Sequence, residues 1–400
     1  MRLSRRSFLG GLGAVPVASP VLSALVAARG LEEATAAWEA GALPTLTPPA
    51  ADEVRIGGNE NPLGPGKRAL DALIAELDES KRYPFNSRVG NRELLDALAA
   101  RFDAKPDNFV VGAGSSEILR NGVRIFCSPE KHLVTGALSY GSPITASNKF
   151  GNEYRPVPLD DDLRLDLSGM VDAARGAGMV YVCNPNNPTA TLHPASTIES
   201  FITEVQKRAP ESLILVDEAY HDYATDPAHE TMIPLATTRH NVVVARTFSK
   251  AYGMAGLRLG FGCGHPETIE KLRRFSLSAN ANVLAIAAGV ASLGNPRHIE
   301  RERERNTAVR RFTLDFFESS GYSSTDTQTN FLFVNLGRPA KEFREACAKD
   351  NVFVARDFPP MENTHCRISI GTMDEMKRAT AVFAKVLGVK SSDSGAGGAQ

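Results

Sequence analysis

The sequence has 400 residues, which exceeds the usual size of a single hydrophobic core and predicts one large domain with a smaller companion, or two comparable domains. Its 45 basic and 46 acidic side chains give a formal charge of −1, so the electrostatic basis for binding nucleic acid or an anionic membrane is lacking. The five cysteines are widely spaced and follow no metal-ligand pattern, and we expect neither a disulfide framework nor a zinc site.

The first residues are similar to an export signal. Arg5 and Arg6 precede a Gly/Ala-rich, mildly apolar stretch that holds no acidic residue and runs to about residue 28. Glycine and proline interrupt this stretch, which disfavours a membrane-spanning helix. The pattern resembles a twin-arginine (Tat) signal. We therefore expect a periplasmic or exported protein without a membrane span in its mature form, or a cytoplasmic one if the signal is not used.

Along the folded part, short β-branched runs alternate with longer amphipathic stretches, which is typical of βαβ units and a mostly parallel sheet. We expect buried strands at 109–112, 132–135, 179–182, 213–216 and 241–245. Each ends just before a polar or Gly-rich cluster, where open α/β sheets bind ligands. A charged helical pattern at 297–319 is typical of a solvated helix face and leads to further strands at 331–334 and 366–370.

These elements predict an α/β chain with a large domain, whose sheet has helices on both faces, and a smaller α+β domain. The expected organisation is an export signal and flexible leader at 1–45, an N-terminal segment packing with the small domain at 46–80, the large domain at 81–295, the small C-terminal domain at 296–390 and a disordered tail at 391–400.

A lysine, two hydroxyls and an arginine follow the strand at 241–245. Burial lowers the pKa of a lysine, so the neutral amine of Lys250 becomes available to form a Schiff base with a carbonyl. The hydroxyls of Thr247 and Ser249, together with the Arg258 fork, suit a phosphate. Taken alone, a surface lysine on a loop remains the alternative.

Three other strand ends carry polar groups. Asp217 ends a strand and Tyr220 follows, so both can face one crevice where an acid holds a ring nitrogen protonated; the alternative is an Asp that caps the next helix. The loop at 184–188 places amides after another strand, with a plain turn as the alternative. Ser115 and Ser116 follow a glycine at the expected start of a helix, whose free N–H groups and dipole can hold a phosphate.

Taken in this order, the segments resemble class I/II (fold-type I) aminotransferases, which depend on pyridoxal 5′-phosphate, and are most similar to histidinol-phosphate aminotransferases. The resemblance covers roughly residues 50–390 and rests on the stretches 59–65, 82–84, 184–189, 217–220, 249–258 and 367–372. It implies the fold-type I architecture, with the cofactor bound by the domain at 81–295.

The resemblance implies catalytic roles for three residues. Lys250 would form the Schiff base with the cofactor and later move the proton at the substrate Cα. Asp217 would pair with the ring nitrogen. Tyr220 would hydrogen-bond the phenolic oxygen of the cofactor, as would Asn187.

The remaining site residues are also implied by the resemblance. Tyr140 would stack on the cofactor ring. The phosphate would be bound by Ser115, Ser116, Thr247, Ser249 and Arg258. Tyr83 would reach the phosphate of the partner subunit, which makes a homodimer the functional unit. Arg367 would bind the anionic group of the substrate, and Arg356 and Asn61 match positions near the substrate pocket; the alternative for Arg356 is a surface residue.

Two features depart from the family pattern. Ala190 stands where the family loop usually has glycine, and alanine resists the positive φ that glycine allows. Histidine biosynthesis is cytoplasmic, whereas the leader indicates export, so we expect a histidinol-phosphate aminotransferase-like enzyme with another role. The eight histidines lack a metal-ligand spacing, and no metal is expected.

The predicted function is transfer of an amino group from an amino acid or related amine to a 2-oxoacid by a ping-pong mechanism. One alternative is a pyridoxal-phosphate-dependent lyase or decarboxylase on the same fold, because the bond that breaks at Cα is the one aligned with the π system. Another is a non-catalytic relative that binds a ligand or a protein. The joint presence of Lys250, Asp217, Tyr220, Asn187 and Arg258 argues against it.

Overall fold

The computed structural model of the chain describes residues 53–390. Contacts divide the chain after Glu53, and the helices and strands described below belong to the unit that starts at Val54. The expected export signal and leader at 1–45 and the expected tail at 391–400 lie outside the described residues. Among the described residues, no helix combines the length and the apolar character needed to span a bilayer.

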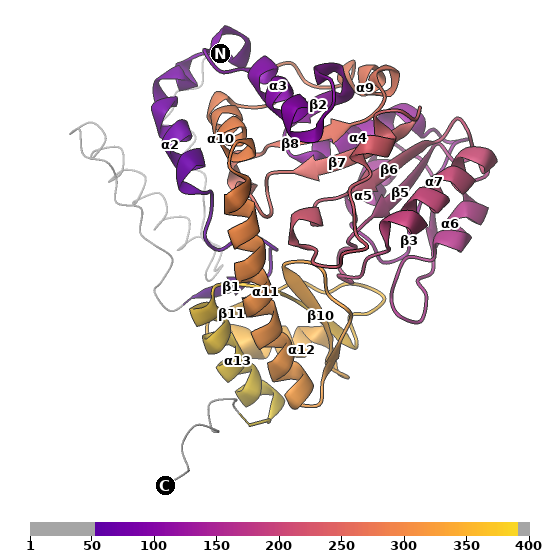
Figure 1. Cartoon of the computed structure of the whole chain (residues 1–400). Helices are drawn as coiled ribbons and strands as arrows, with labels where there is room; N and C mark the ends of the chain where they lie inside the picture. Colours follow the sequence, from indigo (N-terminus) through magenta and orange to yellow (C-terminus); the bar gives the residue numbers. More distant parts are fainter. Residues whose placement is uncertain (1–52, 391–400) are drawn as a thin grey trace, which may run out of the picture. The chain divides into compact units, whose positions relative to one another are not determined.

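Seven strands form the large sheet in the order β2-β8-β7-β6-β5-β3-β4 (Figure 1). Their bounds are β2 Phe109–Gly112, β3 Leu133–Gly136, β4 Tyr154–Val157, β5 Met179–Cys183, β6 Leu213–Asp217, β7 Val242–Thr247 and β8 Gly260–Cys263. The pairings from β4 through β3, β5 and β6 to β7 are all parallel, whereas β8 runs antiparallel to β2 and β7. The expected mostly parallel sheet is confirmed, and the carboxyl ends of β5, β6 and β7 meet at one edge.

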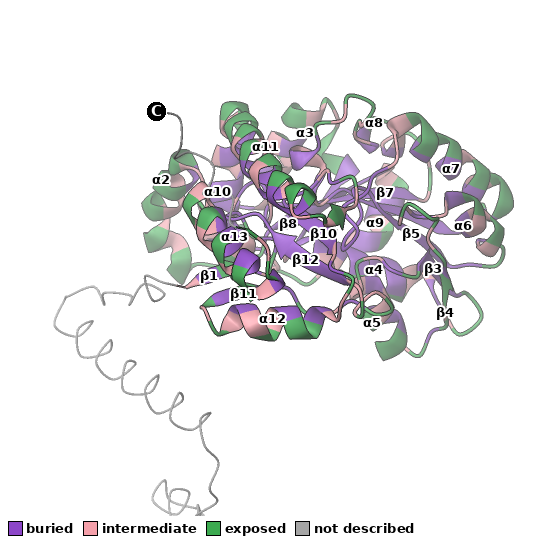
Figure 2. Ribbon diagram, turned by 90° about the horizontal axis from the view of Figure 1, so that it is seen from below, coloured by how far each residue is buried: buried purple, intermediate pink, exposed green. Residues whose placement is uncertain are grey.

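Helices cover both faces of this sheet. One face packs against α4 (Ser115–Phe126), α5 (Ser142–Lys149) and α9 (Pro266–Arg273). The other packs against α3 (Asn91–Phe102), α6 (Leu167–Ala173), α7 (Ala195–Arg208), α8 (Ile233–Ala236) and α10 (Val283–Leu293). Figure 2 shows β5, β7 and β8 in the buried colour and the outer surface of α7 exposed. This cover on both faces explains why the strands are continuous apolar runs.

The C-terminal part has its own core. The long helix α11 (Pro296–Ser319) leads to an antiparallel sheet, β12-β10-β9, made of β9 (Ser323–Ser324), β10 (Phe331–Asn335) and β12 (His365–Ser369). This sheet shares a hydrophobic cluster with α11, α12 (Ala340–Ala348) and α13 (Met373–Leu387). Strand β1 (Val54–Ile56) pairs in parallel with β11 (Val352–Val354), while α2 (Lys67–Ala75) packs on α10. Short 3₁₀ turns lie at Leu77–Lys81, Pro84–Asn86, Pro106–Asn108, His221–Tyr223 and Ala255–Leu257.

The seven strands expected from the sequence are present, each within about two residues of its expected bounds, and the helix expected at 297–319 is α11. Strand β8 was not expected, because its sequence, Gly-Phe-Gly-Cys, has little of the β-branched character that indicates a strand. Gly260, the first residue of β8, packs closely against the start of α4. A Cβ built on it would lie 2.3 Å from the backbone nitrogen of Ser115. Glycine therefore lets β8 lie directly under the start of α4.

Candidate active site

A cleft of about 310 Å³ lies where β5, β6 and β7 end and α4 begins. Arg356 and Arg367, from the C-terminal region, and Gly58, from the segment after β1, also line it. It brings together twelve of the residues singled out in the sequence, namely Ser115, Ser116, Tyr140, Asn187, Asp217, Tyr220, Thr247, Ser249, Lys250, Arg258, Arg356 and Arg367. The carboxyl ends of the parallel strands bring the residues of the large sheet together. Packing of the C-terminal region against this edge adds Arg356 and Arg367, so that residues more than 250 positions apart form one site.

Lys250 lies in the turn after β7, and its amine reaches the backbone oxygen of Gly58 at 3.3 Å. Burial, with a smaller contribution from the nearby Arg367, lowers the pKa of the Lys250 amine to about 8. The amine also lies 5.7 Å from the ring centroid of Tyr220. This shift raises the neutral fraction of the amine near neutral pH by roughly 300-fold over an ordinary lysine, which makes Lys250 suited to act as a nucleophile and a base.

Asp217 is the last residue of β6 and is almost fully buried. The Tyr181 hydroxyl donates a hydrogen bond to its Oδ2 at 2.8 Å, and the backbone N–H of Ala219 donates to its Oδ1 at 3.1 Å. Burial raises the pKa of the Asp217 carboxyl to about 6, although these hydrogen bonds act in the opposite direction. A cationic group in the cleft would bring the pKa down again, so the carboxylate is placed to hold a positive partner.

The Tyr220 hydroxyl is held by two amides. Asn187 and Asn59 each direct an Nδ2 at its oxygen, at 3.2 and 3.1 Å. Because the oxygen already accepts two hydrogen bonds, the phenolic hydrogen is free to be donated into the cleft. Arg367 orients the first amide, since its Nη1 donates to the Asn187 Oδ1 at 2.7 Å.

The remaining donors gather around the start of α4. Thr247 donates to the Ser249 hydroxyl at 3.0 Å, and Arg258 Nη1 donates to the same oxygen at 3.3 Å. The guanidinium lies against Gly114, where a Cβ would come within 2.3 Å of its Nη2, and the φ of Gly114 is +77°. Glycine is therefore required for this close approach. Hydroxyls, a guanidinium and a helix N-terminus together suit a phosphate.

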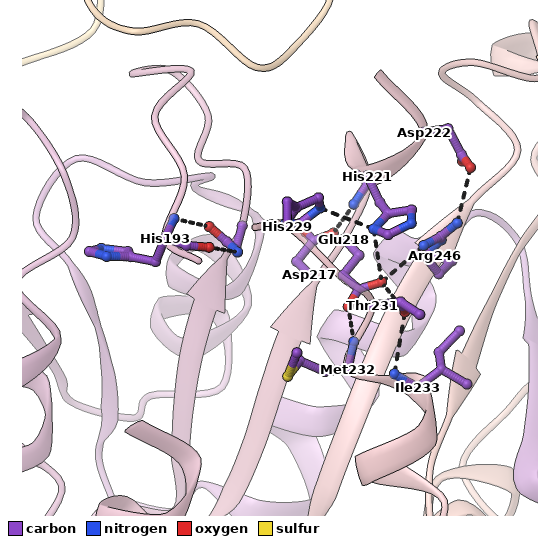
Figure 3. Close-up of polar contacts among 12 residues, drawn as sticks. His193, Asp217, Glu218, His221, Asp222, His229, Thr231, Met232, Ile233 and Arg246 are labelled. Carbon is purple, nitrogen blue, oxygen red and sulfur yellow. Dashed lines mark hydrogen bonds and ion pairs between the residues drawn. The ribbon is translucent and has the colours of Figure 1, made fainter. Parts of the chain in front are cut away.

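A second polar cluster lies behind the cleft, around the neighbour of Asp217 (Figure 3). The buried Glu218 carboxylate accepts hydrogen bonds from Arg246 at 2.9 Å, from Thr231 at 2.7 Å and from the backbone N–H of Met232 at 2.7 Å. Burial alone raises the pKa of Glu218, but the charge of Arg246 and these donors outweigh it, so that the pKa is lowered. Since Arg246 lies in β7 and Glu218 directly follows β6, the pair joins the two strand ends that carry Asp217 and Thr247.

Two predicted residues lie elsewhere. Asn61 does not line the cleft; it is buried, and its Nδ2 donates to the backbone oxygen of Ala251 at 3.0 Å, which ties the segment after β1 to the lysine turn. Tyr83 is 67% exposed, outside the cleft, and stacks on Phe85 at 5.3 Å.

The sequence interpretation missed several contacts of the site, notably those of Asn59, Tyr181 and Phe358. The tyrosine could have been found, because a phenol inside the apolar strand β5 needs a buried partner. The contacts of Asn59 and Phe358 depend on packing between segments that are far apart in the sequence.

Ala190 adopts the left-handed conformation, with φ of +64°. Its backbone N–H donates to the Asn186 oxygen at 2.8 Å, and its own oxygen accepts from the Gln328 N–H at 3.1 Å. These bonds hold the loop in a shape that glycine would adopt without strain.

Comparison with known proteins identifies the family. The model for "Aminotransferase class I and II" matches residues 51–383. The chain belongs to this family. It is 34% identical to the histidinol-phosphate aminotransferase of Moorella thermoacetica over 84% of this chain and 85% of that one, and 33% identical to the aromatic amino acid aminotransferase of Nocardia farcinica over 83% and 92%. The crystal structure of histidinol-phosphate aminotransferase from Sinorhizobium meliloti, in complex with pyridoxal-5′-phosphate, superposes with a TM-score of 0.77 at 27% identity, covering 84% of this chain and 90% of that one.

This chain is therefore an aminotransferase that depends on pyridoxal phosphate, and the residues of the cleft fit that cofactor. The donors around Arg258 would hold its phosphate. Asp217 would face its ring nitrogen, Tyr220 and Asn187 would face its phenolic oxygen, and Lys250 would face its aldehyde. The positive φ of Gly114 lets the backbone before α4 approach the Arg258 guanidinium, an arrangement suited to an anion.

Proposed function

We propose that this aminotransferase works as an exported homodimer and takes its amino group from a donor that also carries an anionic group, a carboxylate or a phosphate. The acceptor is a 2-oxoacid. The observation that carries the choice of donor is the pairing of Arg356 and Arg367 in the cleft, beside Lys250.

The two arginines converge on one aromatic ring. The guanidinium carbons of Arg356 and Arg367 lie 4.6 and 4.7 Å from the ring centroid of Phe358. Burial, and to a smaller extent the charge of Arg356, lowers the pKa of Arg367. The Nε of Arg367 is buried and has no hydrogen-bond partner among the described residues. Two neighbouring guanidiniums with donor capacity to spare favour an anion between them.

The residues divide the reaction between them. Pyridoxal phosphate, when bound, supplies the electron sink for negative charge at the substrate Cα. Asp217 keeps the proton on the ring nitrogen, and Tyr220 donates its hydroxyl hydrogen to the phenolic oxygen. Lys250 takes the proton from Cα and returns one on the way to product, which its lowered pKa permits. Arg367 orients the donor through its anionic group.

The test compares pairs of amines that differ only in the anion. Purified holoenzyme is mixed with histidinol phosphate or histidinol, and with phenylalanine or phenylethylamine, and loss of the visible cofactor absorption is followed. We expect a preference of about 100-fold or more for each anionic member. Arg367→Gln should reduce that preference, whereas Arg92→Gln, at an exposed arginine of α3, should not. Equal rates for both members of each pair would contradict the proposal.

Product analysis separates transfer from other chemistry. With 2-oxoglutarate as acceptor, transamination gives glutamate and the oxo form of the donor in equal amounts. Release of ammonia or carbon dioxide in place of glutamate would indicate the lyase or decarboxylase alternative. The rate with histidinol phosphate relative to the rate with phenylalanine distinguishes a phosphate-bearing donor from an amino acid.

The homodimer is supported by exposed apolar side chains along one segment. Tyr83 and Phe85 are 67% and 68% exposed, and Leu63 and Ile74 are 59% and 61% exposed. Large apolar groups gathered in this way favour contact with a second copy. Sedimentation should show a dimer, and Phe85→Asp should shift it toward monomer and lower the cofactor content.

Export is supported by the twin-arginine pattern at the start of the sequence. The full chain, expressed in a bacterium with a twin-arginine pathway, should accumulate in the periplasm. The variant with Arg5→Lys and Arg6→Lys should remain in the cytoplasm, and equal distribution of both would contradict this part of the proposal.

A further inference from the structure

A second cluster of ligating side chains lies at the edge of the large sheet opposite the cleft. His240 precedes β7, His265 is the N-cap residue of α9, and Glu267 lies in the first turn of that helix. One ligand atom from each lies within 4.8 Å of those of the other two. The Nδ1 of His240 is 3.5 Å from a carboxylate oxygen of Glu267, and the two imidazole rings are 3.8 Å apart between centroids.

Hydrogen bonds to the backbone fix the segment before β7, which holds His240, against the start of α9, which holds His265 and Glu267. The backbone N–H of Asn241 donates to the hydroxyl of Thr268, in α9, at 2.9 Å. The backbone oxygen of His240 accepts a hydrogen bond from Gln206 at 3.0 Å. Pro266 fixes the backbone between the second imidazole and the carboxylate. The juxtaposition is thus set by the fold on both sides and does not depend on the contact between the side chains themselves.

We propose that His240, His265 and Glu267 bind a divalent transition-metal ion, for which zinc is the best fit. Zinc takes imidazole nitrogen and carboxylate oxygen at about 2.0–2.2 Å in a tetrahedral arrangement, which places ligand atoms about 3.3–3.6 Å apart. The separation of 3.5 Å between His240 and Glu267 already meets this requirement. Small side-chain rotations bring in the third ligand, and water fills the fourth position. Magnesium and calcium prefer all-oxygen sites and do not fit two imidazoles.

The neighbouring cations are engaged elsewhere. Lys271 donates to the side-chain oxygen of Asn241 at 3.4 Å and lies over the ring of Phe126. Arg239 bonds to Thr203 and Gln206. Hence neither of these charges is committed to the Glu267 carboxylate, which is 73% exposed and accessible to an ion.

Binding carries one local cost. The Nδ1 of His265 accepts the backbone N–H of Glu267 at 3.4 Å, a weak helix cap. Coordination through Nε2 moves the imidazole proton to Nδ1 and ends this bond.

This site is independent of the aminotransferase chemistry. Strand β7 has six residues, about 20 Å at the usual rise, and separates His240 from the lysine turn. Substitutions in the cluster should therefore leave turnover unchanged. Zinc binding should instead raise the stability of the folded protein.

The test is calorimetric titration of chelator-treated, dialysed holoenzyme with zinc chloride. We expect one saturable site per chain, no binding of magnesium, and at least tenfold weaker binding in His240→Gln, His265→Gln and Glu267→Gln. Glu270→Gln, at another exposed acid of α9, and His298→Gln are the matched controls and should bind as the wild type does. Absence of a saturable site, or equal binding in all five variants, would overturn the proposal.

Thermal unfolding provides a second readout. An ion that binds only the folded state raises the melting temperature. Zinc should raise that of the wild type and of the two control variants, but not of the three cluster variants. In chelator, each variant gives its own reference melting temperature, from which the rise caused by zinc is measured. If zinc raised the melting temperature of the three cluster variants equally, the ion would bind at another site and the assignment would be wrong.

Discussion

Asp217 and Glu218 are consecutive residues and both are almost fully buried, yet the pKa values of their carboxyls are shifted in opposite directions. The pKa of Asp217 is raised to about 6, because burial is not offset by a close cation. The pKa of Glu218 is lowered, because burial is outweighed by His221, by Arg246 at 2.9 Å and by two further hydrogen bonds. Asp217 lines the cleft, whereas Glu218 bonds to Arg246 and Thr231 in the second cluster (Figure 3).

The difference shows that the fold keeps the groups that bind cofactor and substrate apart from the groups that hold the strand ends in place. In the cleft, charged groups lack complete partners and retain the capacity to bind a cofactor and a substrate, at a cost in stability. Behind it, Glu218 and Arg246 bond to each other and to Thr231, Met232 and Asp222, and so hold the strand ends in place. Substitutions on the two sides should therefore act in opposite directions on stability.

The largest expected effect is that of Lys250→Met. Turnover should fall by at least about 10⁴-fold, because both the nucleophile and the base are removed. The folded-state pKa of about 8 lies below the unfolded value, so the charged amine destabilises the fold fully below pH 8 and not above pH 10.5. The variant should accordingly gain up to about 3 kcal/mol at pH 7 in urea unfolding of the cofactor-free protein. A clear loss of stability in Lys250→Met would contradict the contrast between the cleft and the cluster around Glu218.

Glu218→Gln should act in the opposite direction. It removes the charge that balances the buried Arg246 and should destabilise the protein by about 3–5 kcal/mol. Urea unfolding measures this, with Asp217→Asn at the adjacent position as the control that should not lose stability. If the two variants unfold alike, the contrast between cleft and support is wrong.

The pH dependence of stability sharpens the contrast further. The folded-state pKa of Asp217 is raised from 3.8 to about 6, so the folded state binds more protons across that window and stability falls as pH rises through it. Relative to Asp217→Asn, the cofactor-free wild type should lose up to about 3 kcal/mol between pH 4 and pH 6. Melting curves at several pH values test this. A constant difference between the two proteins across that range would contradict the raised pKa.

The smallest expected effect is that of Ala190→Gly in the loop that carries Asn187. Relief of the left-handed backbone is worth roughly 1–2 kcal/mol, and loss of the buried methyl group costs nearly 1 kcal/mol. We expect a gain of less than about 1 kcal/mol in the same unfolding assay, with activity retained. Ala190→Val serves as the opposite control and should be clearly destabilised.

Much of the site could be predicted from short stretches, because each strand of a parallel sheet ends at the same edge and a polar group after an apolar run must lie there. Asp217, Tyr220, Lys250 and Arg258 are examples. Tyr83 comes only from the family resemblance, which places it at the site of a partner subunit; it is exposed and lies outside the cleft of its own chain, and its role stays a prediction.

The amino-acid sequence by itself determined the class of fold, seven of the described strands and the set of polar groups at strand ends, because hydrophobic periodicity and strand ends are local properties. Only the tertiary structure decided which of these groups meet. Asn59 reaches Tyr220, Arg356 and Arg367 converge on Phe358, and His240 approaches His265, each across a long separation in sequence. Such contacts depend on how sheets and helices pack, which no local pattern encodes.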